Sequence, residues 1–290
     1  MSNLVDADRR AWAGGALDAE LDVPAMAGPT RIYDLAVRLE PGMARHPAHP
    51  PFSFTLMKRH QDHPYPGGIT ACSEMITMGG HVGTHVDALG HIACCGEIHG
   101  GREILDAHTI QGGLEIGSIE EVPPLIGPGH LVDAEALFGR PLTPADGIGP
   151  DELERWFAQH AEPGPGSIVL FRTGWMRYWD EPDRYIGLAT GLPGLTRAGA
   201  EWLSARLILA AGSDTMNLEH KIAGVVSLQV HVHFLVERGI YIMESMNLER
   251  LAADGVTDFH FVAAPLRVAG GTGSPLRPLA IVSSEQPNAR

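Results

Sequence analysis

The sequence predicts an α/β fold, and two observations support this prediction. Short apolar runs bounded by glycine or polar residues recur in the second half of the chain, and helix-like segments lie beside them. The composition is globular, with 44% hydrophobic and 19% charged residues, and 290 residues suffice for one large core without disulfides. No break in composition divides the chain. We therefore expect a single domain at residues 30–290, preceded by an N-terminal arm at residues 1–29.

Two kinds of strand are expected. Residues 33–39 and 52–56 alternate large apolar side chains with smaller or polar ones. This period of two is typical of strands with one buried face, so the sequence predicts two early antiparallel strands. Three later apolar runs, at 167–171, 207–210 and 240–243, have glycine or polar residues at their ends. Such short, continuous runs predict strands that are buried on both faces.

Two helices are expected next to these later strands. Asp151 precedes the segment 152–157, and Thr196 precedes the segment 197–206. Both residue types cap helix N-termini, because their side-chain oxygens accept hydrogen bonds from the first free backbone N–H groups. Strands and helices therefore alternate through the second half, which is the order that builds α/β sheets.

The net charge and the cysteine content limit which classes of partner and which cellular compartment we expect. Acidic residues number 35 against 21 basic ones, and the formal charge of −14 repels phosphate backbones and anionic lipids, so we expect no nucleic-acid and no membrane partner. Cys72, Cys94 and Cys95 are an odd number and two are adjacent, which favours a reducing compartment. No signal sequence and no apolar stretch of about 18 residues occurs. These features predict a cytoplasmic protein.

The most informative segment is HVGTHVDALGH, which places His81, His85, Asp87 and His91 within eleven residues. Imidazole nitrogens and carboxylate oxygens are the usual non-thiol ligands of Zn²⁺ and similar ions, and three such ligands leave a coordination position for water. Gly83 is expected to form a bend that brings the side chains together. Packing alone gives no reason for this cluster, since each polar group would need its own buried partner.

The motif resembles that of the metal-dependent cyclase-like hydrolases, which include bacterial kynurenine formamidase and isatin hydrolase. Every fixed position of the family pattern H-x-G-T-H-x-D-x3-H is present. The resemblance implies that His81, His85 and Asp87 bind a divalent ion, Zn²⁺ or Mn²⁺, and that His91 is a general acid and base. It also implies the swivelling β/β/α architecture of mixed sheets and a homo-oligomer, a dimer or tetramer.

A second segment, HVHFLVERGIYIMESMNLERL, resembles the family's second motif, in which a His and a later Glu complete or support the metal site. Glu244 is the matching carboxylate, and either His231 or His233 is the matching imidazole. We favour His231. Positions two apart on a helix point about 200° away from each other, so only one of the pair reaches the site if the segment is helical.

This chemistry predicts hydrolysis of an amide. A divalent ion lowers the pKa of bound water from about 15.7 toward 7 and polarises a carbonyl, while His91, with an ordinary pKa near ~6.5, carries the proton to the leaving nitrogen.

The resemblance also bears on the substrate. Kynurenine formamidases share an aromatic residue where this chain has His46, so the longer isatin-hydrolase-like branch and a cyclic amide, a lactam or imide, are favoured. An N-formyl arylamide or a lactone is the alternative substrate within the family. Four residues are candidates for contact with the small-molecule substrate: His46, Phe52, Trp175 and Asp214.

Two other classes of protein remain as alternatives. His231, His233 and Glu237 match part of the cupin metal motif, which would indicate an iron or manganese oxygenase or isomerase. That interpretation needs a strand at 231–233 and a later histidine, for which His260 is the candidate. A non-enzymatic binding protein stapled by a metal is the other alternative, and it predicts a closed site without exchangeable water.

Overall fold

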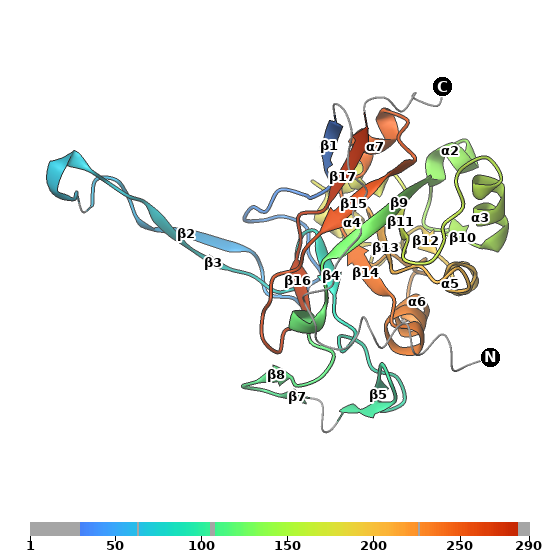
Figure 1. Ribbon diagram of the computed structural model, residues 1–290, viewed down its shortest axis with the longest axis horizontal. Helices are drawn as coiled ribbons and strands as arrows, with labels where there is room; N and C mark the ends of the chain where they lie inside the picture. Colours follow the sequence, from blue (N-terminus) through green and yellow to red (C-terminus); the bar gives the residue numbers. More distant parts are fainter. Residues whose placement is uncertain (1–29, 63, 105–107, 226, 284–290) are drawn as a thin grey trace.

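The computed structural model describes residues 30–62, 64–104, 108–225 and 227–283 (Figure 1). The N-terminal arm expected at residues 1–29 lies outside them. The expected α/β fold is confirmed, because one curled mixed sheet of nine strands carries helices on its faces. Its strands, in spatial order, are β1 (Thr30–Asp34), β17 (Leu279–Ser283), β15 (Asp258–Ala263), β9 (Leu125–Asp133), β11 (Ile168–Arg172), β13 (Ala210–Ser213), β14 (Tyr241–Glu244), β4 (His85–Asp87) and β16 (Gly273–Pro275).

The sheet is parallel at its centre and antiparallel at its two sides. Strands β9, β11, β13 and β14 run parallel, while β4 and β16 follow them antiparallel on one side and β15, β17 and β1 on the other. Eight short strands form separate pairs: β2 (Ser53–Lys58) with β3 (Ser73–Thr77), β5 (Glu97–Ile98) with β6 (Arg102–Glu103), β7 (His108–Thr109) with β8 (Gly113–Leu114), and β10 (Gly147–Ile148) with β12 (Gly194–Leu195).

Apolar side chains fill both faces of the parallel strands. Ile168 and Leu170 of β11 belong to one buried cluster, and Val169 and Phe171 belong to another on the opposite face, as the alternation of a strand requires. None of the described helices is long and apolar enough to cross a membrane. They are α2 (Ala134–Phe138), α3 (Pro150–Phe157), α4 (Pro182–Ile186), α5 (Arg197–Ser204), α6 (Gln229–His231) and α7 (Glu249–Ala253), with the short 3₁₀ turns η1 (Pro66–Gly68), η3 (Ile119–Glu121) and η4 (Trp175–Tyr178) and the π-helical η5 (Val232–Arg238).

The elements expected in the second half are present, with two shifts. Thr196 caps α5 as expected, accepting a hydrogen bond of 3.1 Å from the Gly199 N–H. Helix α3 begins two residues earlier than expected, because Pro150 with its fixed φ occupies the first helical position and Gly149, not Asp151, is the cap. Strand β13 begins only at Ala210, because Leu207 adopts a left-handed turn with φ 59°.

The early strands differ more from the prediction. Strand β1 ends at Asp34, and residues 35–40 form no strand although Leu35 and Val37 are buried. Strand β2 exists, but it pairs only with β3, and its side chains are exposed rather than half-buried. The β2–β3 hairpin extends far from the body of the molecule (Figure 1). The period of two thus correctly predicts a strand in the second segment, but not what lies against it.

Candidate metal site

Strand β4 aligns the first three candidate ligands. His85 and Asp87 are two positions apart on the strand and share a face, while Val86 between them packs into the core. Gly83 turns the chain with φ 70°, and a Cβ there would lie 2.5 Å from Leu39 Cδ2, so only glycine fits this bend. The bend returns His81 to the strand, where its Nδ1 lies 2.7 Å from Asp87 Oδ1.

The edge strand β16 supports the ring of His81. Gly273 is the partner of Asp87 in the antiparallel register, and a Cβ on Gly273 would lie 2.5 Å from His81 Cε1. The Thr272 hydroxyl oxygen lies 2.9 Å from His81 Nε2. Sequence reasoning missed both residues, because glycine and threonine in a turn carry no signature of metal binding.

A second group of ligand atoms comes from β14 and α6. Strand β14 pairs with β4 so that Glu244 lies opposite His85, and Glu244 Oε2 is 3.3 Å from His85 Nε2. His231 lies in the first turn of the helix that precedes β14, and its Nε2 is 3.1 Å from Glu244 Oε1 and 3.8 Å from Asp87 Oδ2. The two groups, His81–His85–Asp87 and Asp87–His231–Glu244, share Asp87, and the ligand atoms of each lie within 4.8 Å of one another.

His233 lies outside this cluster. Its Nε2 is 2.8 Å from Ser204 Oγ and its Nδ1 is 2.7 Å from Glu237 Oε2, so both ring nitrogens are used between α5 and η5. Residues 229–238 are helical, which directs positions 231 and 233 to different sides. Of the two histidines, only His231 contacts Glu244.

The cupin interpretation is wrong for the same reason. It requires residues 231–233 to be a strand, whereas they belong to α6 and η5. Glu237 forms ion pairs with His233 and Arg197 instead of pointing to the cluster. His260 lies on β15, which β9, β11 and β13 separate from β14.

Hydrogen bonds determine which ring nitrogen of His85 and which of His231 faces the cluster. His85 Nδ1 lies 2.8 Å from the Gly83 carbonyl oxygen and donates to it, so its Nε2 faces the carboxylates. His231 Nδ1 lies 2.6 Å from Glu219 Oε1, which orients the ring in the same way. Metal-binding histidines in proteins are typically held by such a bond on the other nitrogen. Glu219 was not found from the sequence, since it follows a turn after β13 with no motif around it.

The charges of the cluster fit a cation. Asp87 and Glu244 are 1% and 6% exposed. Burial disfavours their ionisation, but the neighbouring imidazoles hold the pKa of both carboxyls below its ordinary value. Burial alone would lower the pKa of His85, yet the hydrogen bond and charge of Glu244 raise it to about 9.

The same balance applies to His231, whose pKa Glu219 and Glu244 raise well above its ordinary value against the effect of burial. The buried carboxylates thus favour the protonated, positively charged form of these imidazoles. A divalent cation supplies that charge and takes the place of the protons, so this donor set of imidazole and carboxylate suits such an ion.

His91 stands beside the cluster with free ring nitrogens. Its ring stacks on His81 with 3.9 Å between centroids. Within the described ranges, no protein group hydrogen-bonds either ring nitrogen of His91. Burial, only partly opposed by Asp87, lowers the pKa of His91 to about 4. Its imidazole is therefore neutral near pH 7 and able to accept a proton.

The loop at 42–52 covers the outer side of His81. His49 stacks on His81 with ring centroids 5.2 Å apart, and His46 lies edge-on to His49 at 5.7 Å. Arg45 holds this loop in shape by donating to the carbonyl oxygens of His46, Pro47 and His49, the last at 2.8 Å. His46 is thus one ring further from the cluster than His49.

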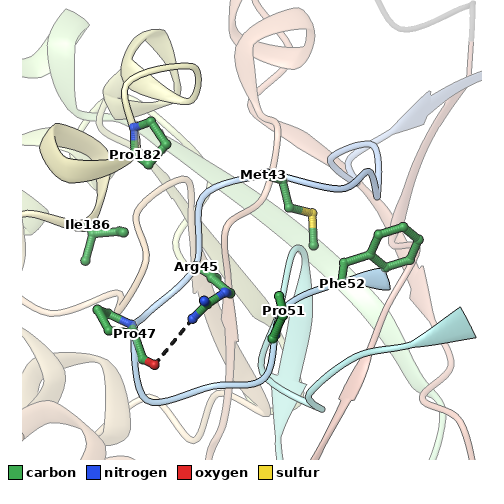
Figure 2. A pocket seen from close by; sticks show the side chains of 8 residues that line it. Met43, Arg45, Pro47, Pro51, Phe52, Pro182 and Ile186 are labelled. Carbon is green, nitrogen blue, oxygen red and sulfur yellow. Dashed lines mark hydrogen bonds between the residues drawn. The ribbon is translucent and has the colours of Figure 1, made fainter. Parts of the chain in front are cut away.

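A cavity of about 300 Å³ lies against the same loop (Figure 2). Phe52 lines it, and none of the candidate metal ligands does. The loop therefore adjoins both the cavity and the metal cluster. The cavity is lined by Gly42, Met43, Arg45, Pro47, Pro51, Phe52, Pro182 and Ile186.

The other three substrate candidates, His46, Trp175 and Asp214, do not line this cavity. Trp175 is packed in a small core with Tyr185, and its Nε1–H donates to the Tyr185 carbonyl oxygen at 3.1 Å. Asp214 is fully buried, and its carboxylate accepts hydrogen bonds from the Thr173 N–H and hydroxyl and from the Gly174 N–H. Its oxygens thus close the turn after β11. The side chains of Trp175 and Asp214 make their polar contacts within the protein.

Proteins similar to this chain are known both by sequence and by structure. Residues 33–220 match the family model described as putative cyclase. The isatin hydrolase of Roseibium aggregatum is 31% identical over 212 residues, 71% of this chain and 73% of that protein. The kynurenine formamidase of Bacillus cereus is 26% identical over 244 residues, 84% of this chain and 94% of that protein. The crystal structure of a novel cyclase aligns with a TM-score of 0.79 at 26% identity, covering 88% of this chain and 87% of that one.

Proposed function

Because this chain belongs to the cyclase family, whose relatives above are hydrolases, we propose that it is a divalent-metal-dependent hydrolase of a small cyclic amide, a lactam or imide. One observation supports this proposal most: three buried imidazoles and two buried carboxylates converge beside the imidazole of His91, which makes no hydrogen bond within the described residues. Such a set suits an ion that activates water, with a separate group left over for proton transfer.

The ion would be held by His81, His85 and Asp87, with His231 and Glu244 completing or supporting the site. Zn²⁺ and Mn²⁺ both accept imidazole and carboxylate ligands. When bound, such an ion lowers the pKa of water and polarises the carbonyl under attack. Glu219 and the Gly83 carbonyl keep His231 and His85 in the orientation that binds it.

His91 would move the proton. Its neutral ring, stacked on His81, accepts a proton from the attacking water and then donates it to the amide nitrogen as the C–N bond breaks. Proton transfer by a positioned side chain contributes roughly 10²–10⁴ to a rate. His91 thus links attack on the carbonyl to departure of the nitrogen.

The substrate would enter beside the loop at 42–52. Phe52 offers an aromatic surface, and a cavity of about 300 Å³ admits a small molecule only. The relative named isatin hydrolase points to a cyclic amide of this size. An N-formyl arylamide, after the relative named kynurenine formamidase, or a lactone is the second candidate substrate.

Metal analysis combined with a substrate panel tests this function. The panel contains isatin, other lactams, cyclic imides, lactones and N-formyl anilines, offered to the purified protein with and without Zn²⁺ or Mn²⁺. We expect ion-dependent hydrolysis of the cyclic amides and loss of both bound ion and activity in His81→Ala. A protein that binds stoichiometric metal and hydrolyses nothing in the panel contradicts the proposal.

The role of His91 has its own test. In His91→Gln we expect the metal content of the wild type and a kcat lower by roughly 10²–10⁴-fold, because the ring binds no ion in this proposal. His233→Gln is the matched control, since His233 lies outside the cluster, and its metal content and kcat should stay near the wild type. If His91→Gln loses the ion as His81→Ala does, His91 is a ligand and not the proton carrier.

A further inference from the structure

Two of the three cysteines are neighbours in a tight turn that follows His91. Cys94 and Glu97 form an antiparallel bridge, in which the backbone N–H of each donates to the carbonyl oxygen of the other at 2.9 and 3.0 Å. Cys95 and Gly96 are therefore the two central residues of a hairpin turn that leads into β5. The Sγ atoms of Cys94 and Cys95 lie 3.5 Å apart, so the turn presents two thiols in direct contact.

The backbone of this turn is one that asparagine and glycine prefer. Cys95 has φ 56° and Gly96 has φ 90°, as the two central residues of a type I′ hairpin turn do. A left-handed backbone is unfavourable for most side chains, because Cβ comes too close to the following carbonyl oxygen. Formation of the turn alone therefore does not account for a cysteine at position 95.

The two sulfurs differ in their surroundings. Cys95 is exposed, whereas Cys94 is half-buried. The hydrogen bond with Cys95 raises the pKa of the Cys94 thiol, and the charge of the Glu237 carboxylate acts in the same direction. Cys94 thus keeps its proton and donates it toward the sulfur of Cys95. An oxidant in solution meets Cys95 first, and Cys94 is in place to react with the oxidised sulfur.

We propose that Cys94 and Cys95 are a site of reversible oxidation, at which a peroxide converts the two thiols to a disulfide. With hydrogen peroxide, the Cys95 thiolate attacks one oxygen, the O–O bond breaks, and a sulfenic acid and water form. The Cys94 sulfur then attacks the Cys95 sulfur, and the sulfenic oxygen leaves as a second water. Two electrons pass from the sulfurs to the peroxide oxygens, and the two thiol protons end in the two water molecules.

The geometry favours a disulfide that forms easily and is easily reduced. The sulfurs need only approach from 3.5 Å to about 2.05 Å. Consecutive Cα atoms are about 3.8 Å apart, whereas most disulfides join Cα atoms about 4.4–6.8 Å apart, so a bond between neighbours is strained. Strained or exposed disulfides are the labile ones, because thiols reduce them readily. The pair therefore suits a reversible modification and not a permanent cross-link.

The turn is attached to the candidate site on both sides. Cys94 lies three residues after His91, and Ile92 between them packs against the apolar core. Beyond the turn, His99 Nδ1 lies 2.9 Å from the Val236 carbonyl oxygen, which joins the β5–β6 hairpin to η5. Oxidation would alter the backbone close to His91, so on the proposed function it would also affect the proton carrier. The reaction of the thiols does not depend on that function.

Peroxide titration of the purified full chain tests the proposal, with thiol counting and intact mass as readouts that need no hydrolytic activity. Cys72 is the internal standard, because it is also exposed but precedes β3, on the hairpin that projects from the body (Figure 1). We expect the thiols of Cys94 and Cys95 to be lost together, at least about 10-fold faster than that of Cys72. The mass should fall by two hydrogen atoms, and dithiothreitol should restore both thiols.

The Cys72→Ser variant isolates the pair. Its two thiols should be lost at a rate that is independent of protein concentration, since the second sulfur belongs to the same chain. Cys95→Asn keeps a residue that the turn prefers, and its remaining Cys94 should react no faster than Cys72. Cys94→Ser removes the second sulfur, so oxidation of Cys95 should end in a gain of oxygen.

Circular dichroism checks that each variant keeps its fold. Equal rates of loss for all three thiols in the wild type would overturn the proposal. So would a pair that gains oxygen atoms instead of losing hydrogen, or disulfides that form only between two chains. Each of these outcomes is independent of what the substrate panel shows.

Discussion

The imidazole of His81 is held from three sides, by Asp87, by the Thr272 hydroxyl and by the bare backbone of Gly273. In Gly273→Ala the new Cβ would lie 2.5 Å from the ring, so the ring must shift. We expect metal affinity to fall by roughly 10–100-fold, as for other residues that orient a ligand, with little change in melting temperature. A competition titration against a chromogenic chelator measures it.

Gly164→Ala is the control for this change. Gly164 has no atom within 4 Å of the position of a Cβ and no positive φ. Its metal affinity should equal that of the wild type. Equal affinities in all three proteins would show that the contact with Gly273 does not position His81.

The pair Arg140–Asp146 predicts a dependence of stability on pH. Two hydrogen bonds from Arg140, at 2.7 and 2.8 Å, hold the pKa of Asp146 well below its ordinary value. A carboxyl with a lowered folded pKa stabilises the protein above its unfolded pKa of about 3.9, and the contribution is lost as pH falls through the folded pKa. Because Arg140 is half exposed, we expect Arg140→Met to cost only about 0.5–1 kcal/mol at pH 7.

Urea denaturation at several pH values measures this difference. The gap between wild type and Arg140→Met should narrow as pH falls from about 4 toward 2. A gap that is constant over this range would mean that Arg140 stabilises the protein by packing alone.

The sequence predicted part of the candidate site at the residue scale. His81, His85 and Asp87 are close in the chain, so a single bend and a short strand gather them, and a local pattern can predict that. Glu219, Thr272 and Gly273 reach the same place from distant segments. Their approach depends on which strands pair, and no local pattern carries that information.

The helix at 229–238 ends at a glycine in the left-handed conformation, as α2 does. Gly239 ends it with φ 64°, and a Cβ there would lie 2.7 Å from His99 Nε2. Gly139 ends α2 with φ 67° in open space. Gly139→Ala should therefore cost about 1 kcal/mol for the left-handed backbone alone, and Gly239→Ala roughly 2 kcal/mol or more, since His99 must also move.

Urea unfolding of both variants compares these costs. Because η5 carries the chain into β14, Gly239→Ala should also disturb Glu244 and lower metal affinity, which Gly139→Ala should not. Equal costs for the two variants would mean that His99 yields freely.

The sequence predicted correctly the strands that are buried on both faces, and it failed for segments that are covered on one face or on neither. Strands β11 and β14 are covered on both faces, so a short apolar run is sufficient to identify them. Residues 33–39 and 52–56 share one alternating pattern but meet different surroundings. The first segment leaves the sheet after Asp34, and the second becomes an exposed hairpin.

Removal of the ion tests the metal at the scale of the whole molecule. Two large apolar clusters cover the sheet independently of the donor set, so the fold should persist without the ion. A ligand that binds only the folded state at 100 times its dissociation constant adds about 2.7 kcal/mol. We therefore expect a chelator to abolish hydrolysis and to lower the melting temperature by roughly 5–10 °C, with an unchanged circular dichroism spectrum at 25 °C.

Readdition of Zn²⁺ or Mn²⁺ should restore both activity and melting temperature. If chelation instead unfolds the protein at 25 °C, the ion is a structural staple, and the non-enzymatic interpretation gains.

The candidate ligand residues lie far apart in the chain, and their positions determine when during synthesis an ion could be bound. During synthesis His81, His85 and Asp87 leave the ribosome early, His231 and Glu244 follow some 150 residues later, and the backbone of Gly273 that braces His81 comes after both. A nascent or prematurely terminated polypeptide has only a fragment of this chelating pocket. On the proposed function, metal would therefore bind tightly only after β16 has been synthesised, and shorter polypeptides would bind it more weakly.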